Sequence, residues 1–554
     1  MRTILLVLSF YFLNNVAAQP VASSSLTPHQ VQSLSVLGKV WGFLKYYHPQ
    51  VTTGKLNWDS VLISKTPLFV QSRDVAATSV LVQSWLTELG KVDTCITCDN
   101  QLPDSVCYNL DLSWFYNSGF DAALIHRLEY LQRNRSQQQY YASYGNASQV
   151  NCGSELPYAK PEYLYPEPAF RLLSLFRYWN IVQYFSPYKY LCGQDWKNVL
   201  NEFIPRVYNA KDTLEYHLCL FELTAKLNDG HSVTSYSPQL LQYFGSYSRV
   251  PFQCTLIDGK AVVERIYNDS ICAVQHIQKG DVFISVNGES IADKKKRWLK
   301  YVMAASNDGA REAVFCSTLL FQSADSICKA EKLVDGKRVP VVLKVYTTYP
   351  ENPVVAKPWK LLQQDIAYVD LGQLQVKDVP GMMNELKQVG SIIFDIRNYP
   401  RDTWPALANY LAARPFTFSR MTFPDLKYPG VFRWMKAAVY GRQSDTAYKG
   451  KVILLVDVST KSHGEYTAMA LQAATKTITI GSTTAGADGN ITPWTTFPGR
   501  FMTHFSGLGI YYPDGTPAQR KGIKIDIVVH PTIAGLQAGR DEVLEKAVEI
   551  VRRQ

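Results

Sequence analysis

A serine lies three residues before a glutamate at a point where the chain changes character. Ser462 and Glu465 stand between the run 452–456, typical of a buried strand, and the helix-forming run 465–475. This spacing is that of a capping box, which predicts Ser462 to be the cap of a helix. A serine at a strand-to-helix turn also lies beside free N–H groups that can stabilise an oxyanion. Ser462 is therefore either a cap or a nucleophile, and the second role requires a base elsewhere in the chain.

The first 18 residues predict export. A basic start is followed by an apolar run over 4–13 and by the small residues Val16 and Ala18, as in a secretory signal peptide. That run is too short to span a bilayer, and no later run approaches the required length. No cysteine follows Ala18 to carry a lipid anchor. We expect an exported protein, periplasmic or extracellular, without a membrane span.

The cysteines allow two interpretations. Ten occur, all at or before Cys328, and an even number in an exported chain predicts disulfides whose pairing the sequence does not decide. Cys95 and Cys98 have metal-ligand spacing, so these two with Cys107 and Cys152 are an alternative zinc site. The part of the chain after Cys328 can contain no cysteine nucleophile.

The charge does not indicate nucleic acid. The net charge is +10, but the basic residues are scattered, and the one tight cluster, 294–297, is short. Export and an aromatic content of 12% also argue against nucleic-acid binding. The cluster is predicted to be a solvated loop.

An internal repeat predicts helices in the first half of the chain. Residues 40–62 match 178–200 at an offset of 138 residues, with apolar residues at three- and four-residue spacing around a proline-containing turn. We expect a first helical unit over 19–94 and a second over 166–245. The polar segment between them, 95–165, which contains four cysteines, is predicted to be a linker.

Two further domains follow. Residues 246–350 carry alternating strands with a turn at Asn287–Gly288 and resemble a PDZ domain, whose groove binds an extended peptide as an extra strand. The alternative is a plain β-barrel module without a ligand. Strands and helices alternate over 351–554, which predicts an α/β domain with a largely parallel sheet.

These parts together resemble the S41 family of serine peptidases, which includes tail-specific and tricorn core proteases. The resemblance covers roughly 165–554 and rests on the order of LNDGHS (227–232), the PDZ-like unit, S-x-x-E, GSTTAG (481–486) and GIKIDI (522–527). It implies a multidomain α+β protein with N-terminal helical repeats, a PDZ-like β-rich domain and a C-terminal crotonase/ClpP-like α/β core.

The resemblance assigns the catalytic residues. Ser462 matches the nucleophile. Ala487 stands where tail-specific proteases have their lysine base, so His231 of the D-x-H motif is expected to be the base, as in the tricorn-like branch. Gln519 stands where that branch has a glutamate that orients the base, and it can hold an imidazolium only weakly. Asp229 is expected mainly to cap its turn.

The same resemblance predicts an oxyanion hole. The N–H of His463 is the first donor, and because Pro400 has no N–H, Arg401 or Tyr399 is expected to supply the second. Gly486 shapes the loop beside the site and is predicted, with Asn398, to bind substrate.

The function expected from the sequence is an exported serine peptidase that hydrolyses peptide bonds in peptides or proteins, with cleavage near C-termini as one form. No metal or organic cofactor is required, and the oligomeric state is open. Two alternatives are a weak or inactive binding protein for peptides or apolar ligands, and an exported scaffold.

Overall fold

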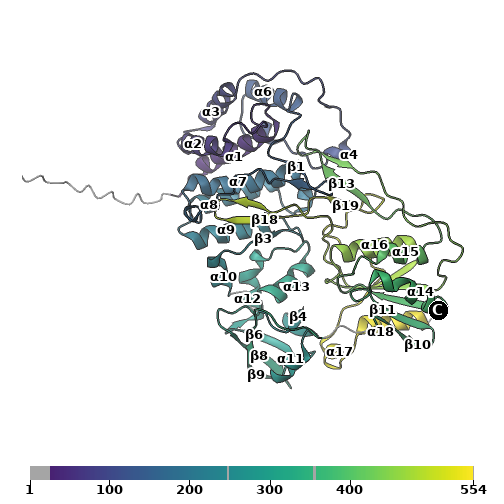
Figure 1. The fold of residues 1–554 in the computed structure, drawn as a ribbon. Helices are drawn as coiled ribbons and strands as arrows, with labels where there is room; N and C mark the ends of the chain where they lie inside the picture. Colours follow the sequence, from purple (N-terminus) through teal and green to yellow (C-terminus); the bar gives the residue numbers. More distant parts are fainter. Residues whose placement is uncertain (1–24, 246–248, 353–356, 553–554) are drawn as a thin grey trace, which may run out of the picture.

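The structure is a computed structural model that describes residues 25–245, 249–352 and 357–552. A helical lobe lies at the top of Figure 1, a β-rich unit at the lower left and an α/β domain at the right. The predicted signal peptide, residues 1–18, lies outside the described residues. Within them, no helix is long and apolar enough to cross a membrane.

Two helical hairpins form the lobe, and each is closed by a tryptophan pair. Trp41 and Trp58 each donate their indole N–H to the other's carbonyl at 3.0 Å. Trp179 and Trp196 exchange the same two bonds at 2.8 and 3.1 Å. The two repeat copies therefore have the same local arrangement. The helices are α1 (Pro28–Tyr47), α2 (Trp58–Val70) and α3 (Val75–Glu88), then α7 (Pro168–Phe185), α8 (Trp196–Tyr208) and α9 (Thr213–Ala225).

The segment 95–165 is not a linker, which corrects the expectation from its polar composition. Its longest helix buries Leu124, Leu128 and Leu131 in the core of the lobe. Its other elements are too short to show a hydrophobic period in the sequence. They are α4 (Asp104–Cys107), α5 (Trp114–Asn117), α6 (Ala122–Arg133), β1 (Ser143–Tyr144), β2 (Val150–Asn151) and η1 (Pro161–Tyr163).

The β-rich unit is an antiparallel sheet in the order β4-β5-β6-β8-β9, with β7 paired to β6. Its resemblance to a PDZ domain stays a prediction. The basic cluster 294–297 lies in helix α12, not in a loop, and Lys294 is buried. The strands are β4 (Phe252–Ile257), β5 (Lys260–Ile266), β6 (Val282–Val286), β7 (Glu289–Ser290), β8 (Ile327–Val334) and β9 (Lys337–Lys344), and the helices α10 (Pro238–Phe244), α11 (Asp269–Val274), α12 (Ile291–Trp298), η3 (Leu299–Tyr301) and α13 (Asp308–Thr318).

The α/β domain has a six-stranded sheet in the order β10-β11-β12-β15-β16-β20, parallel from β11 to β20. Helices α14, α15 and α16 cover one face, and α18 packs on the other. The strands are β10 (Trp359–Gln363), β11 (Ile366–Asp370), β12 (Ser391–Asp395), β15 (Lys451–Val456), β16 (Thr477–Gly481) and β20 (Ile527–Val528). The helices are η4 (Val376–Asp378), α14 (Val379–Leu386), α15 (Trp404–Leu411), α16 (His463–Ala474), α17 (Ile533–Gln537) and α18 (Glu542–Arg552).

Two small sheets extend from the α/β domain, and one of them reaches the helical lobe. In it, β3 (Val233–Thr234), at the end of the second helical unit, pairs antiparallel with β18 (Phe501–His504), which also pairs with β17 (Thr495–Phe497). The other contains β13 (Arg420–Pro424), β14 (Phe432–Trp434) and β19 (Gly509–Tyr511). Because β3 follows His231 directly, this pairing brings the predicted base to the peptidase half of the chain.

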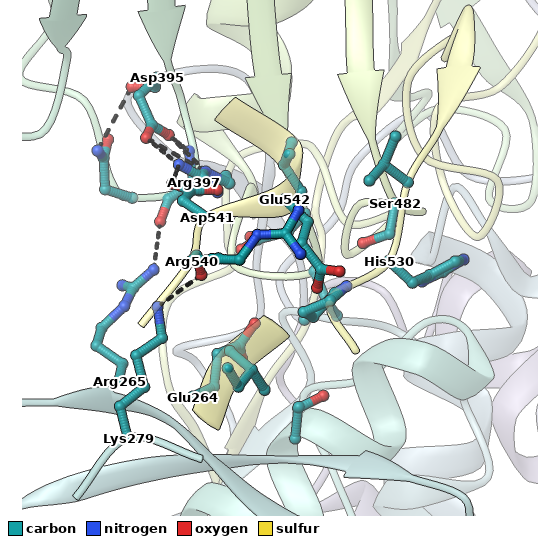
Figure 2. A pocket seen from close by; sticks show the side chains of 18 of the residues that line it. Glu264, Arg265, Lys279, Asp395, Arg397, Ser482, His530, Arg540, Asp541 and Glu542 are labelled. Atoms are coloured by element: carbon teal, nitrogen blue, oxygen red, sulfur yellow. Dashed lines mark hydrogen bonds and ion pairs between the residues drawn. The ribbon is translucent and has the colours of Figure 1, made fainter. Parts of the chain in front are cut away.

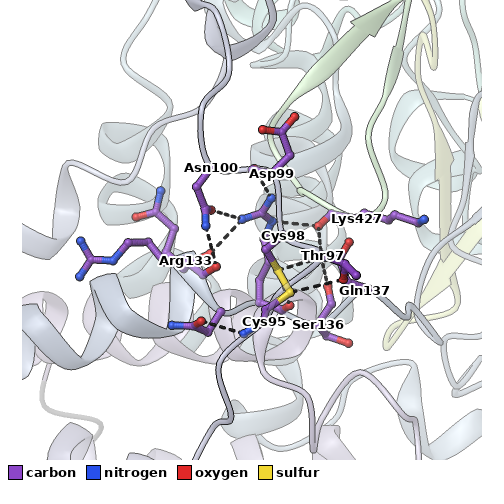
Figure 3. Close-up of a disulfide and its surroundings, with 12 residues drawn as sticks. Cys95, Thr97, Cys98, Asp99, Asn100, Arg133, Ser136, Gln137 and Lys427 are labelled. Atoms are coloured by element: carbon purple, nitrogen blue, oxygen red, sulfur yellow. Dashed lines mark hydrogen bonds between the residues drawn. A yellow bond between two sulfur atoms is a disulfide. The ribbon is translucent and has the colours of Figure 1, made fainter.

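Cys95 and Cys98 form a disulfide, which excludes them as zinc ligands (Figure 3). The side chain of Arg135 donates to the carbonyls of Asp99 and Lys427 at 2.7 and 3.0 Å, and so ties this turn to the α/β domain. The remaining eight cysteines are free thiols, seven of them buried. In the described ranges, no cluster of three or more His, Cys, Asp or Glu side chains could hold a metal ion.

Candidate active site

Ser462 lies in a strained turn between strand β15 and helix α16. Its φ of 54° and ψ of −116° place it in the left-handed region, which costs a residue with a Cβ about 1–3 kcal/mol. The backbone N–H of Ser462 donates to the carbonyl of Ala487 at 2.9 Å and to Glu465 Oε2 at 3.3 Å. A serine held in a strained strand-to-helix turn is the geometry of a nucleophile elbow. The residue is thus at the N-cap position of α16 and also in a conformation that suits a nucleophile.

Glu465 holds the loop beside this turn. Its fully buried carboxylate accepts hydrogen bonds from Thr484 Oγ1 at 2.5 Å and from the N–H groups of Gly486 and Ala487 at 2.8 Å. Burial raises the pKa of Glu465, and these hydrogen bonds act in the opposite direction. The glutamate of the S-x-x-E spacing therefore fixes the loop 484–487 against Ser462.

His231 is held by a buried polar cluster. Its Nδ1 lies 2.9 Å from Ser506 Oγ, and its backbone N–H donates to Asp229 Oδ1 at 3.0 Å. Ser506 in turn donates its hydroxyl to Asp229 Oδ1 at 2.8 Å and its N–H to Oδ2 at 2.7 Å. In the described part of the chain, His231 Nε2 has no hydrogen-bond partner. The ring is anchored through one nitrogen and the other remains available.

The turn that carries His231 packs directly on the loop that contacts Ser462. A Cβ built on Gly230 would lie 2.1 Å from Ala487 Cβ, so the two backbones approach as closely as glycine permits. A second junction is formed by Lys461, whose Nζ donates to the carbonyl of Ala304 at 3.3 Å. The N–H of Ala304 donates to the carbonyl of Ser232 at 2.9 Å. The turns that carry Ser462 and His231 therefore both contact Ala487.

His231 is neutral at physiological pH. Burial lowers the pKa of His231 to about 4, with smaller lowering effects from the positive charge of Lys461 and from His504, whereas Asp229 raises it. A neutral imidazole can accept a proton from a serine hydroxyl. The surroundings of His231 thus keep it in the form that can accept a proton.

Gln519 contacts the base only indirectly. Its buried side-chain amide donates to Asp229 Oδ1 at 3.2 Å, and its Oε1 accepts from the N–H of Asp488 at 3.4 Å. The sequence placed Gln519 next to the imidazole, whereas in the structure Asp229 and Ser506 lie between them. Ser506 was missed because no local motif marks it, and only the β3–β18 pairing brings it to His231.

The predicted oxyanion groups lie around the first turn of α16. The N–H of His463 has no hydrogen-bond partner among the described residues. The carbonyl of Asn398 and the Cδ of Pro400 pack against Gly464, at 3.6 and 3.7 Å from where its Cβ would be. The exposed side chain of Arg401 donates to the carbonyl of Gly372 at 2.9 Å. The loop 397–401 therefore packs on the first turn of α16, and a second donor from its backbone stays a prediction.

The two predicted substrate-binding residues differ in their surroundings. Asn398 lines a charged cavity of about 670 Å³ between the β-rich unit and the carboxyl edge of the sheet (Figure 2). Its Nδ2 donates to Asp370 Oδ1 at 2.8 Å, and its buried Oδ1 has no partner among the described residues. Gly486 does not line this cavity, and its N–H and carbonyl are bonded to Glu465 and Arg520.

Arg265 and Lys279 of the β-rich unit reach this cavity opposite Arg397, Asp395 and Asp541 (Figure 2). Arg397 forms ion pairs with Asp395 and Asp541 at 2.6 and 2.7 Å. Arg265 Nη2 donates to the carbonyl of Arg397 at 3.0 Å. The β-rich unit is therefore bonded to the loop that packs on the first turn of α16.

Comparison with known proteins identifies the class. Residues 365–529 match the model of peptidase family S41. Mature CPAF superposes with a TM-score of 0.52 at 12% identity, over 70% of this chain and 98% of that chain. Mature CPAF complexed with lactacystin gives 0.51 at 12% identity, over 70% and 99%. The photosystem II D1 C-terminal processing protease gives 0.39 at 17% identity, over 67% and 98%, a score too low to carry an argument. A search of curated proteins finds no match for the chain.

At 12% identity, the likeness to CPAF shows that the folds are similar and nothing more. The assignment to peptidase family S41 rests on the match over residues 365–529. The matched residues include β15, the Ser462 turn and the loop 484–487. The protein is a serine-type peptidase. Its α/β domain belongs to peptidase family S41.

Proposed function

We propose that the protein hydrolyses peptide bonds by acyl transfer, with Ser462 as the nucleophile and His231 as the general base. The observation that carries this proposal is the junction at Ala487. Its carbonyl accepts the Ser462 N–H at 2.9 Å, and its Cβ abuts Gly230, next to His231. The strained turn at Ser462 and the neutral imidazole of His231 support the same assignment.

The chemistry follows the usual order for such a pair. Nε2 of His231 takes the hydroxyl proton of Ser462 as Oγ attacks the carbonyl carbon, and the imidazolium returns that proton to the leaving amine. The oxyanion accepts hydrogen bonds from the N–H of His463 and from a backbone N–H of Tyr399 or Arg401. Water then enters the same cycle and releases the acyl group. The substrate is a peptide or protein, and Asn398 holds it at the edge of the charged cavity.

The first test is labelling of Ser462 by a fluorophosphonate probe, read by mass spectrometry together with cleavage of a mixed peptide library. We expect the wild-type protein to be labelled and the Ser462→Ala variant to be neither labelled nor active. Ser459→Ala is the matched control, because Ser459 is a half-buried serine in the same loop. Folded wild-type protein that takes no label and cleaves no peptide would instead favour the binding-protein alternative. The cleavage sites would show whether the enzyme acts near C-termini.

Export is a second part of the proposal, supported by the composition of residues 1–18. N-terminal sequencing of the protein recovered outside the cytoplasm should begin after Ala18. Protein that retains Met1 and stays in the cytoplasm would contradict it.

A further inference from the structure

We propose that Ser506 and Asp229 form a relay that orients His231, with Ser506 as the positioning residue and Asp229 as the source of negative charge. The proposal rests on the proposed function of His231 as the base. It assigns to Asp229 the role that the family resemblance gave to position 519.

The hydrogen bonds of Asp229 fix the direction of the relay. Asp229 is 2% exposed and accepts from two backbone N–H groups, those of His231 and Ser506, at 3.0 and 2.7 Å. With these two donors, the carboxylate oxygens of Asp229 act as acceptors. The single hydroxyl hydrogen of Ser506 therefore points to Asp229 Oδ1, 2.8 Å away.

The tautomer of His231 follows from this direction. Because the Ser506 hydroxyl hydrogen is already committed to Asp229, Ser506 Oγ can only accept from His231 Nδ1, at 2.9 Å. Nδ1 therefore carries the proton, and Nε2 presents its lone pair. The partner of one ring nitrogen thus determines which nitrogen can act as a base.

The proton balance of the step is simple. The O–H bond of Ser462 breaks and an Nε2–H bond forms on His231, while the Nδ1–H and the Ser506 hydroxyl keep their hydrogens. The carboxylate of Asp229 takes up no proton in this step and stabilises the imidazolium through the Ser506 hydroxyl. The other charged or titratable groups that face His231 are Lys461 and His504, which both disfavour the imidazolium. Among the described residues that face His231, Asp229 is thus the charged group that favours the imidazolium.

Ser506 is fixed independently of the substrate. It is fully buried, and it forms an isolated antiparallel bridge with Ile491. Two residues before it, β18 ends at His504, which pairs with Val233 of β3, two residues after His231. The pairing of β3 with β18 therefore positions both His231 and Ser506, whose side chains form the Nδ1 hydrogen bond.

Gln519 is suited to this arrangement as an amide. Its Nε2 donates to Asp229 Oδ1 at 3.2 Å and to Ser306 Oγ at 3.5 Å. A glutamate at 519 would place a second carboxylate against Asp229 and remove that donor, and like charges raise each other's pKa. The relay therefore predicts that Gln519→Glu weakens the site, whereas a family-type role of position 519 predicts that it strengthens it.

The tautomer can be measured without activity. Nitrogen-15 NMR of histidine-labelled protein at pH 7 distinguishes a protonated from an unprotonated Nδ1, and His231→Gln assigns the signal among nine histidines. We expect the Nδ1–H form in the wild-type protein and a shift toward the Nε2–H form in Ser506→Ala. Ser174→Ala is the matched control: this fully buried hydroxyl donates to the carbonyl of Pro498 at 2.8 Å and has no contact with His231. An Nε2–H form in the wild-type protein, or an unchanged form in Ser506→Ala, would overturn the relay.

Rates provide the second measurement. Loss of one hydrogen bond that strengthens in the transition state should slow fluorophosphonate labelling of Ser462 by roughly 10- to 100-fold in Ser506→Ala. With a cleaved peptide, kcat should fall and KM should stay unchanged. Gln519→Glu should also be slower than wild type, and faster labelling would contradict the relay. If wild-type protein takes no label while the Nδ1–H form is present, the proposed function fails and the hydrogen-bond geometry stands.

Discussion

Ser462 adopts a backbone conformation that a serine keeps only when its neighbours hold it. The buried carboxylate of Glu465 and the carbonyl of Ala487 both accept its N–H, and Glu465 also binds the loop that carries Ala487. These hydrogen bonds offset the backbone strain at Ser462, and they are present without a substrate. Placing a nucleophile in this way fixes its position before the substrate arrives.

A substitution of Lys461 can test what sets the pKa of His231. Its positive charge is one of the groups that lower the pKa of His231 to about 4. Only the neutral imidazole can take the serine proton, so labelling of Ser462 slows as the pH falls through the pKa of His231. Lys461→Met removes the charge, and we expect the acid limb of the pH–rate profile to move upward, toward the ordinary value of 6.5.

The control for this prediction is Lys476→Met, which removes an exposed lysine at the other end of α16. Both profiles are measured as second-order labelling rates from pH 4 to 8, a range chosen to include the ordinary histidine value. An acid limb that does not move in Lys461→Met, or that moves equally in the control, would show that Lys461 does not act on His231.

At the residue scale, the spacing of residues along the sequence predicts part of the candidate site. Ser462 and Glu465 lie on one turn, so their spacing alone predicts that they act together. The contact of His231 with Ser506 spans 275 residues and depends on strand pairing, so no spacing in the sequence could predict it. The cap expected at Asp229 is present, because its Oδ1 accepts the N–H of His231 at 3.0 Å. Its hydrogen bonds with Ser506 join distant parts of the chain, so no spacing in the sequence could predict them.

At the scale of elements, the turn 229–231 must pack on the loop 484–487 for the site to form. Gly230→Ala tests this requirement, because the added Cβ would lie 2.1 Å from Ala487 Cβ and 2.8 Å from Ser306 Oγ. A contact this short forces one backbone to move, and a displacement of about 1 Å can cost ~100-fold in rate. We therefore expect labelling of Ser462 to fall by about that factor while the fold persists.

Gly309→Ala is the matched control for that prediction. Its new Cβ would meet only Asn307 Oδ1, at 3.6 Å, an ordinary contact, and alanine favours the helix α13 in which it lies. Labelling should be unchanged in this variant. Equal labelling in Gly230→Ala and Gly309→Ala would show that the close approach is not needed.

The elements differ in how far the sequence could predict them. The helices around Trp41 and Trp179 are long, carry apolar residues at three- and four-residue spacing and occur twice, so the pattern predicts them. The helices α4 and α5 have four residues each, too few to show a hydrophobic period in the sequence. Helix α6 buries three leucines, but the polar residues of its other face outnumber them, so its composition resembles that of a loop. Composition alone therefore misassigned 95–165 as a linker.

At the scale of the whole molecule, the two repeat copies are joined by buried charges. Lys45 of α1 pairs with Glu155 at 2.6 Å, and Arg177 of α7 pairs with Glu155 at 3.1 Å and with Asp59 of α2 at 2.5 Å. The side chains of these four residues are at most 7% exposed, and their charges balance. The first repeat copy thus completes the charge pairing of helix α7, whose residues 171–185 are all buried.

Arg177→Met tests whether this network holds the lobe together. The substitution keeps an apolar side chain of similar length but leaves Asp59 without its arginine and Glu155 with Lys45 alone. Breaking a buried pair by removing one partner costs about 3–5 kcal/mol, because a desolvated charge remains. We expect a clear fall in the free energy of unfolding, measured by urea titration, and in the thermal midpoint.

Lys65→Met breaks the exposed pair of Lys65 with Glu88, 2.6 Å apart, and should cost about 1 kcal/mol or less. Since α7 leads through α8 and α9 to the turn that carries His231, we also expect Arg177→Met to lower labelling of Ser462 under mild denaturant, where Lys65→Met does not. Equal stabilities of the two variants would mean that the copies are held by apolar packing alone.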